Sequence, residues 1–228
     1  MTDQRPEYVV SGFSIVIMMN PNPLNPAAMS HDVLRNIGVV PSDLTPATDG
    51  IHRTSLLAQL PYEQNVVIRL TPNHAVFEQR SSETAKDIIV HDLARRFVGI
   101  INTSYIALGI NPQVFRPIDG NVSIPITEMF RSNAAWLAYE SHHPSGIEIK
   151  TTYNLPHRVV TITASSVQAT RVDKPEEVIY GMMFQTNVHR EPEGDGDSEW
   201  LHKGIDEWES DVADVLALTS LFMPQQWK

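Results

Sequence analysis

The chain has 228 residues, 42% hydrophobic and 19% charged, a composition typical of a globular protein rather than a disordered or fibrous one. It contains no cysteine, which excludes disulfides, thiolate metal sites, iron–sulfur clusters and cysteine nucleophiles. The formal net charge of −10 opposes binding to a phosphate backbone, so we do not expect nucleic acid as a partner.

The first segment, Tyr8 to Met19, is predicted to be a long strand whose near-continuous apolar series indicates burial on both faces. Its longest apolar run is far shorter than the ~20 residues that a membrane-spanning helix needs, so we expect no membrane segment. The residues before it lack the basic and apolar regions of a secretory signal, and the expected location is the cytoplasm.

A proline-rich excursion follows, because six of the sixteen prolines lie between Pro21 and Pro61. Proline interrupts strand ladders and helices, so only one short helix is expected there, between Ala27 and Ile37. The next predicted strands form a meander and are 55–60, 66–70 and 74–80. An amphipathic helix, Thr84 to Ile101, is then expected to pack on that sheet.

The second half repeats this order. A short strand, Tyr105 to Ile110, ends at Asn111-Pro112, and a helix is predicted from Ile126 to Glu140. Three strands follow in the predicted sequence, at 147–153, 158–167 and 178–188. A polar loop then leads to a final amphipathic helix, Ile205 to Phe222.

Strands in runs, joined by hairpin-length connections and punctuated by helices, favour an antiparallel α+β fold over a doubly wound parallel sheet. We therefore predict one or two mostly antiparallel, curved sheets with about eight strands in two meander-like halves, packed by three main helices that include a C-terminal one. The domain prediction is a single α+β domain, 1–228, or two intimately packed halves, 1–120 and 121–228.

Charge is concentrated near the end of the sequence. Residues 187–228 hold ten acids and three bases, and ten minus three leaves −7 of the total there. The loop His189 to Glu199 places five carboxylates at alternate positions, but it lacks the spacing of a calcium-binding hand, so a solvated loop is favoured. Its acids also suit the positive end of the following helix dipole.

Sequence motifs for catalysis and metal binding are missing. There is no GxSxG elbow, phosphate-binding glycine loop or HExxH pair, and the adjacent His142 and His143 point in different directions on most backbones. We therefore predict no catalytic residue, no metal site and no cofactor, and the enzyme question stays open with a lean toward no activity.

Two sets of residues are candidates for binding. An interface set combines apolar and aromatic residues from the excursion and the C-terminal region: Trp227, Trp208, Leu221, Pro23 and Leu24. A pocket set would lie between the sheet and the helices: Trp136, Tyr153, Met182, Phe184 and the polar Glu140, which needs a partner inside an apolar arc.

Three functions are compatible with these patterns. The first is a non-catalytic protein-binding or assembly component, soluble and cytoplasmic, with a protein partner or a second copy of itself. The alternative is a small-molecule-binding protein or enzyme that uses the pocket set. A second alternative, a regulatory nucleic-acid-associated protein using arginines of the first half, ranks below both because of the net charge.

Overall fold

The computed structural model describes residues 8–21, 23–80, 87–118, 148–170, 176–194 and 196–222. Over these ranges the chain has a mixed α+β fold built on one antiparallel sheet of nine strands, in the order β2-β3-β4-β5-β1-β6-β9-β8-β7. The sheet is open, with β2 and β7 at its edges. The predicted fold class is therefore confirmed, while the predicted helix at 126–140 lies outside the described residues.

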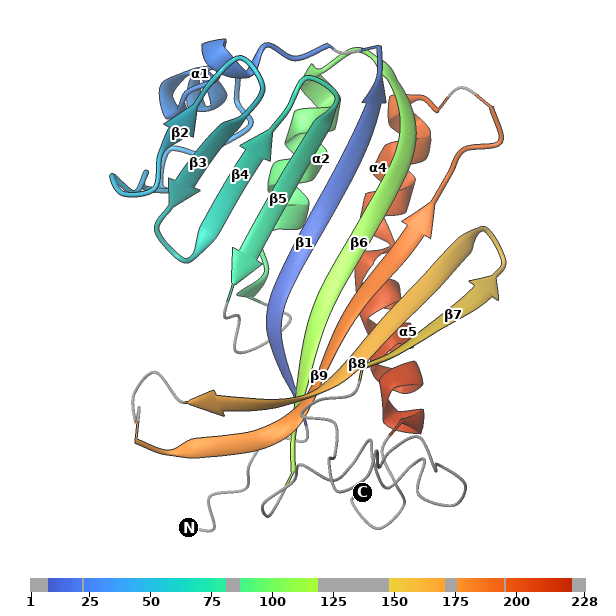
Figure 1. Ribbon diagram of the computed structural model, residues 1–228. Helices are drawn as coiled ribbons and strands as arrows, with labels where there is room; N and C mark the ends of the chain where they lie inside the picture. The colour runs from blue at the N-terminus through green and yellow to red at the C-terminus, as the bar shows by residue number, and fades with distance from the viewer. Residues whose placement is uncertain are drawn as a thin grey trace, which may run out of the picture.

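The strands of the first half are β1 (Val9–Asn20), β2 (His52–Arg53), β3 (Ala58–Tyr62), β4 (Val66–Leu70), β5 (His74–Arg80) and β6 (Ser104–Pro117). Those of the second half are β7 (Glu148–Leu155), β8 (Arg158–Thr170) and β9 (Val178–Arg190). The described helices are the short η1 (Pro26–Ala28) and α1 (His31–Asn36), then α2 (Val90–Ile100), α4 (Ser198–Asp206) and α5 (Trp208–Leu221). Figure 1 shows α2, α4 and α5 on the same side of the sheet.

Strand β1 lies at the centre of the sheet, where it pairs with β5 on one side and β6 on the other. Its residues alternate: Ile15 and Ile17 are fully buried under the helices, while Val16 and Met18 are only partly buried on the other side. The expectation that β1 is buried on both faces is therefore wrong. β-Branched and long apolar residues occupy both sides of β1, but the described helices cover only one.

Strand β6 continues beyond the end predicted for it. It runs through Asn111-Pro112 to Pro117, and Pro112 lies opposite Phe13 of β1. On the β9 side the paired positions jump from Ile110 to Gln113, so the ladder is interrupted where proline has no N–H to donate. The hydroxyl of Thr186 instead donates to the Pro112 carbonyl at 2.5 Å.

The predicted C-terminal helix is two helices, α4 and α5, which meet at Glu207. Helix α4 begins earlier than predicted because the Asp197 side chain caps it and accepts a hydrogen bond from the Trp200 N–H at 2.8 Å. One acid of the polar loop therefore stabilises a helix terminus, as the dipole argument anticipated.

Aromatic side chains tie the helices to the sheet in one continuous core. Trp208 at the start of α5 meets Phe13 of β1 edge-on, with 5.5 Å between ring centroids, and stacks on His91 of α2 at 4.8 Å. Phe77 of β5 and Phe97 of α2 form a second edge-on pair at 5.5 Å. Such pairs stabilise a core beyond the area they bury. None of the helices in the described part of the chain has the length and hydropathy needed to span a bilayer.

One glycine supplies a direct test of this packing. A Cβ atom on Gly181 would lie 2.4 Å from the Arg116 carbonyl oxygen and 2.5 Å from the Phe115 ring, whereas one on Gly99 of α2 would meet nothing within 4 Å. We expect Gly181→Ala to lower the free energy of unfolding by about 1–3 kcal/mol because the backbone must move. Gly99→Ala should raise it by up to about 1 kcal/mol. Urea titration of both variants checks the prediction, and equal effects would contradict the strand packing at Gly181.

Candidate functional site

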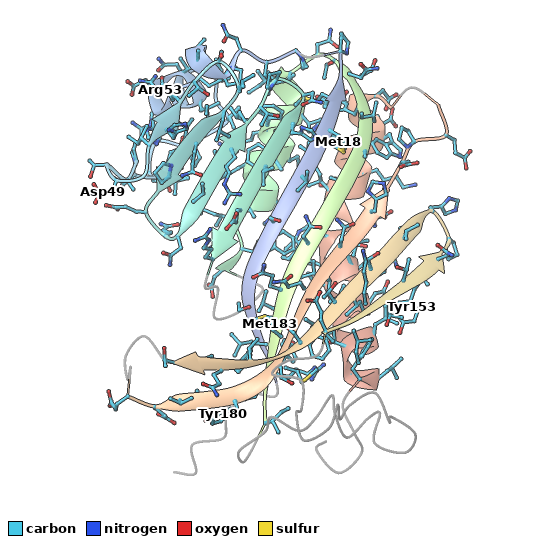
Figure 2. The ribbon with its side chains drawn as sticks, in the orientation of Figure 1. Met18, Asp49, Arg53, Tyr153, Tyr180 and Met183 are labelled. Carbon is cyan, nitrogen blue, oxygen red and sulfur yellow. The ribbon has the colours of Figure 1, made fainter. Side chains whose placement is uncertain are left out.

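The side of the sheet opposite α2, α4 and α5 is left open by the described residues, and we call it the uncovered face. Its members follow from the strand registers and from the alternation of burial along each strand. Met18 and Met183, labelled in Figure 2, lie toward opposite ends of this face. Between them the side chains are mostly amides and hydroxyls.

Two cross-strand rows account for most of these polar groups. The first, here called the Gln113 row, crosses six strands and is paired at every step: Arg80 on β5, Gly12 on β1, Gln113 on β6, Gln185 on β9, Thr163 on β8 and Lys150 on β7. Its two outermost residues are both cationic. Neighbouring strands are ~4.8 Å apart, so five steps separate Arg80 from Lys150 by roughly 24 Å along the sheet.

The second row, here called the Asn111 row, runs beside the first. It contains Glu78 on β5, Ser14 on β1, Asn111 on β6, Asn187 on β9, Thr161 on β8 and Thr152 on β7. The Asn111 amide nitrogen donates to Ser14 Oγ at 3.3 Å, and the hydroxyls of Thr152 and Thr161 lie 3.4 Å apart. Together the rows present a band of groups that both donate and accept hydrogen bonds.

The charge of the uncovered face differs from that of the chain. Its strand residues include three bases, Arg69, Arg80 and Lys150, and two acids, Glu78 and Glu148, so three minus two gives +1. The whole chain carries −10. The acids of the described chain therefore lie mainly elsewhere, many of them on α4 and α5, and net charge is a poor guide to this surface.

Glu78 links the arginines of this face. Arg69 Nη2 lies 2.5 Å from one of its oxygens and Arg80 Nε lies 2.6 Å from the other. Partial burial by itself would raise the pKa of Glu78, but the hydrogen bonds from Arg80 and Arg69 outweigh it and bring the pKa below its usual value. The carboxylate thus stays ionised and fixes both guanidinium groups.

A hollow of about 400 Å³ lies where the two rows meet β1, and we call it the sheet hollow. It is lined by Ser11, Gly12, Phe13, Ser14, Glu78, Gln79, Arg80, Asn111 and Gln113. Gly12 has no side chain to fill it, and the β1–β6 register shifts between Val10 and Gly12. Asn111 Oδ1 is buried there and accepts no hydrogen bond from a described residue.

On the covered side, arginines from three strands bind α5. Asp211 is 0% exposed and accepts two hydrogen bonds of 2.7 Å from Arg190 of β9 and one of 2.8 Å from Arg158 of β8. Arg158 also pairs with Asp214, and Arg116 of β6 donates to the Leu216 carbonyl at 3.0 Å. This cluster holds the helix on the second half of the sheet.

The electrostatics of Arg190 follow from its surroundings. Burial would lower the pKa of its guanidinium, but hydrogen bonds and charge from Asp211, together with Glu207 at 3.1 Å, raise it instead. The Arg190 side chain is 6% exposed, and its guanidinium is therefore permanently charged and bound to Asp211 and Glu207. Its role in the structure is to anchor α5.

A wider groove of about 670 Å³ opens between the β7–β8 turn and α4. Its charged lining residues are Arg158, Arg190, Lys203, Glu191, Glu193 and Glu207. The three bases balance the three acids, and both arginines are already bound by acidic side chains. With His157, His189 and Trp200 also present, the groove is polar without a preference for either sign of charge.

The structure does not gather the predicted pocket set. Met182 and Phe184 are 1% and 0% exposed and belong to the core, and Tyr153 is half-buried against it. None of these three lines the sheet hollow or the groove at α4. Trp136 and Glu140 lie outside the described residues. The small-molecule and enzyme alternative stays an untested prediction.

The interface set is also dispersed. Leu24 and Trp208 are buried in the core at 6% and 7% exposure, and Trp208 packs between Phe13 of β1 and His91 of α2. Pro23 is exposed, and Leu221 is 68% exposed at the end of α5. Trp227 lies outside the described residues. The four described positions do not form one exposed surface.

The histidines do not assemble into a ligand set. His157 and His189 line the groove at α4, while His202 lies near the Arg95 carbonyl at 3.1 Å. Among described residues no group of three or more histidine or acidic side chains is arranged to hold a metal ion. His142 and His143 are outside the described ranges.

Sequence reasoning missed the residues of the two polar rows. Gln113, Asn111 and Gln185 were passed over because single amides within strands carry no motif. The available signal was alternation: Thr161 and Thr163 on β8, and Gln185 and Asn187 on β9, are polar at every second position. Which of these align across strands depends on register, which a single strand does not specify.

Comparisons with known proteins gave one structural likeness. No family model and no curated protein matched the chain. A solved structure described as the rolling circle replication initiator protein from Geobacillus stearothermophilus is similar over 90% of this chain and 80% of that one, with 9% identity and a TM-score of 0.35.

Two expectations are withdrawn. One is the first functional reading, a protein-binding or assembly component with a protein partner or a second copy, and the other is that nucleic acid is not a partner; the similar protein is described as a replication initiator. The physical reason for the second error is that net charge was applied to the whole chain, whereas the uncovered face carries +1. At this TM-score the likeness itself carries no argument about function.

The arginine cluster under α5 gives a stability prediction. Asp211→Asn removes the buried carboxylate shared by Arg158 and Arg190 and leaves the buried Arg190 with only the half-exposed Glu207 as a described acidic partner, so we expect a loss of about 3–5 kcal/mol in the free energy of unfolding. Asp206→Asn is the matched control, because Asp206 pairs with Arg95 at the surface and should cost less than about 1 kcal/mol. Chemical denaturation measures both, and similar losses would show that the cluster contributes no more than a surface pair.

Proposed function

We propose that this chain binds single-stranded nucleic acid on the uncovered face of its sheet. The observation that carries the proposal is the pair of polar rows across six strands, one of them with Arg80 and Lys150 at its ends, on a face that is +1 in a chain of −10. The face thus combines a slight positive charge with two rows of hydrogen-bonding groups.

The chemistry of the rows suits a polynucleotide. Amide side chains donate and accept at once, as base edges do, while arginine and lysine contact phosphates. The rows hold four amides on the neighbouring strands β6 and β9, namely Gln113, Asn111, Gln185 and Asn187. A length of roughly 24 Å would accommodate several unstacked nucleotides of one strand.

Single strands fit this surface better than a duplex does. Among the described residues no helix projects from the uncovered face to enter a groove, and a sheet reaches base edges only when the bases are unstacked and turned toward it. With two or three cations available for phosphates, the dependence of affinity on salt should be shallow, with a slope of roughly −1.4 to −2 in log K against log salt.

The test is a titration of the full chain against fluorescein-labelled single strands and the matching duplex, followed by anisotropy at several salt concentrations. We expect binding to single strands at low salt with the slope given above. Lys150→Ala should weaken that binding and reduce the slope by about 0.7, since one phosphate contact is lost.

Arg95→Ala is the control for this measurement. Arg95 is a half-exposed cation on α2, on the covered side of the sheet, and its loss changes net charge by the same amount as Lys150→Ala. It should leave affinity close to that of the original chain. Absence of single-strand binding at low salt, or equal loss in the two variants, would contradict the proposal.

A further inference from the structure

The base preference of the uncovered face is an inference that rests on the proposed function. We infer that the sheet hollow receives one base of the strand and favours bases that carry an exocyclic amino group over thymine or uracil. The hollow lies within both polar rows, at Gly12 and Asn111, and its volume of about 400 Å³ is ample for a single base.

The orientation of Asn111 is the first support. Its amide nitrogen donates to Ser14 Oγ at 3.3 Å, which leaves Oδ1 as the amide atom without a partner among the described residues. Oδ1 is buried and accepts nothing from the described residues. Buried polar atoms are nearly always hydrogen-bonded in folded proteins, so a buried acceptor of this kind is suited to an N–H donor from outside.

Glu78 adds further acceptors to a lining that also holds the donors of Arg80, Gln113 and the two serines. Glu78 is held ionised by Arg69 and Arg80, and each of its oxygens retains a lone pair beyond those two contacts. The Gln113 amide is exposed at the rim, and a Cβ atom on Gly12 would lie 2.9 Å from its Oε1. A side chain at position 12 would therefore take up part of the hollow and displace the Gln113 side chain.

Asn111 Oδ1 and the Glu78 carboxylate can distinguish bases by one atom. Cytosine presents an amino group where thymine and uracil present a carbonyl oxygen, although the rings are the same size. The amino group can donate to Asn111 Oδ1 and Glu78, whereas the carbonyl would place oxygen against oxygen. Arg80, at the mouth of the hollow and exposed, can contact the adjoining phosphate.

The experiment compares oligodeoxycytidine and oligodeoxythymidine of about 12 nucleotides at neutral pH, by anisotropy with the full chain. We expect the cytidine strand to bind about tenfold more tightly. Asn111→Leu should bring the two affinities together by weakening the cytidine strand alone. Lys150→Ala should weaken both strands equally and keep their ratio.

The outcomes separate the two proposals. If neither strand binds, the proposed function fails and this inference fails with it. If both bind with equal affinity, or if Asn111→Leu leaves the ratio unchanged, nucleic-acid binding stands and the inference about the hollow is overturned. Should Asn111→Leu not fold, binding of free cytidine against uridine to the unaltered chain, followed by chemical-shift changes at Asn111 and Ser14, decides the same point.

Discussion

One-sided cover of the sheet is the constraint on which the other features depend. Helices α2, α4 and α5 all pack on the same face, so every strand divides its residues between a core side and an open side. On the core side the first half is joined by aromatic and aliphatic contacts, and the second half also by guanidinium groups that bind α5. The open side is thereby released from packing and can carry polar chemistry.

The sequence predicted the class of fold because period-two alternation and turn residues are local signals. The predicted end of β6 at Asn111-Pro112 was wrong because proline's usual effect on a strand was overridden. Pro112 stays within β6 because Thr186 donates to its carbonyl and the ladder to β9 skips that position. The candidate site could not be predicted from the sequence for another reason. Gln113 and Gln185 are 72 positions apart, and only strand register places them side by side.

The proposed surface balances attraction against selectivity. Glu78 reduces the positive potential of Arg69 and Arg80, which weakens any general attraction for phosphate, but it also fixes their geometry and adds an acceptor to the sheet hollow. A face of this kind should depend on hydrogen bonds to bases more than on counterion release. The balanced charges of the groove at α4 give it no comparable preference.

The central position of β1 has a consequence for synthesis of the chain. Residues Val9–Asn20 pair with β5 and with β6, whose last residue is Pro117, so the strand is made about 60 to 100 residues before its partners. At roughly 5–20 residues per second, the apolar run of β1 waits on the order of 5–20 seconds on the ribosome without a sheet to join. Such a segment is suited to binding by a chaperone during translation, and the pairing of β1 can be completed only after β6 has emerged.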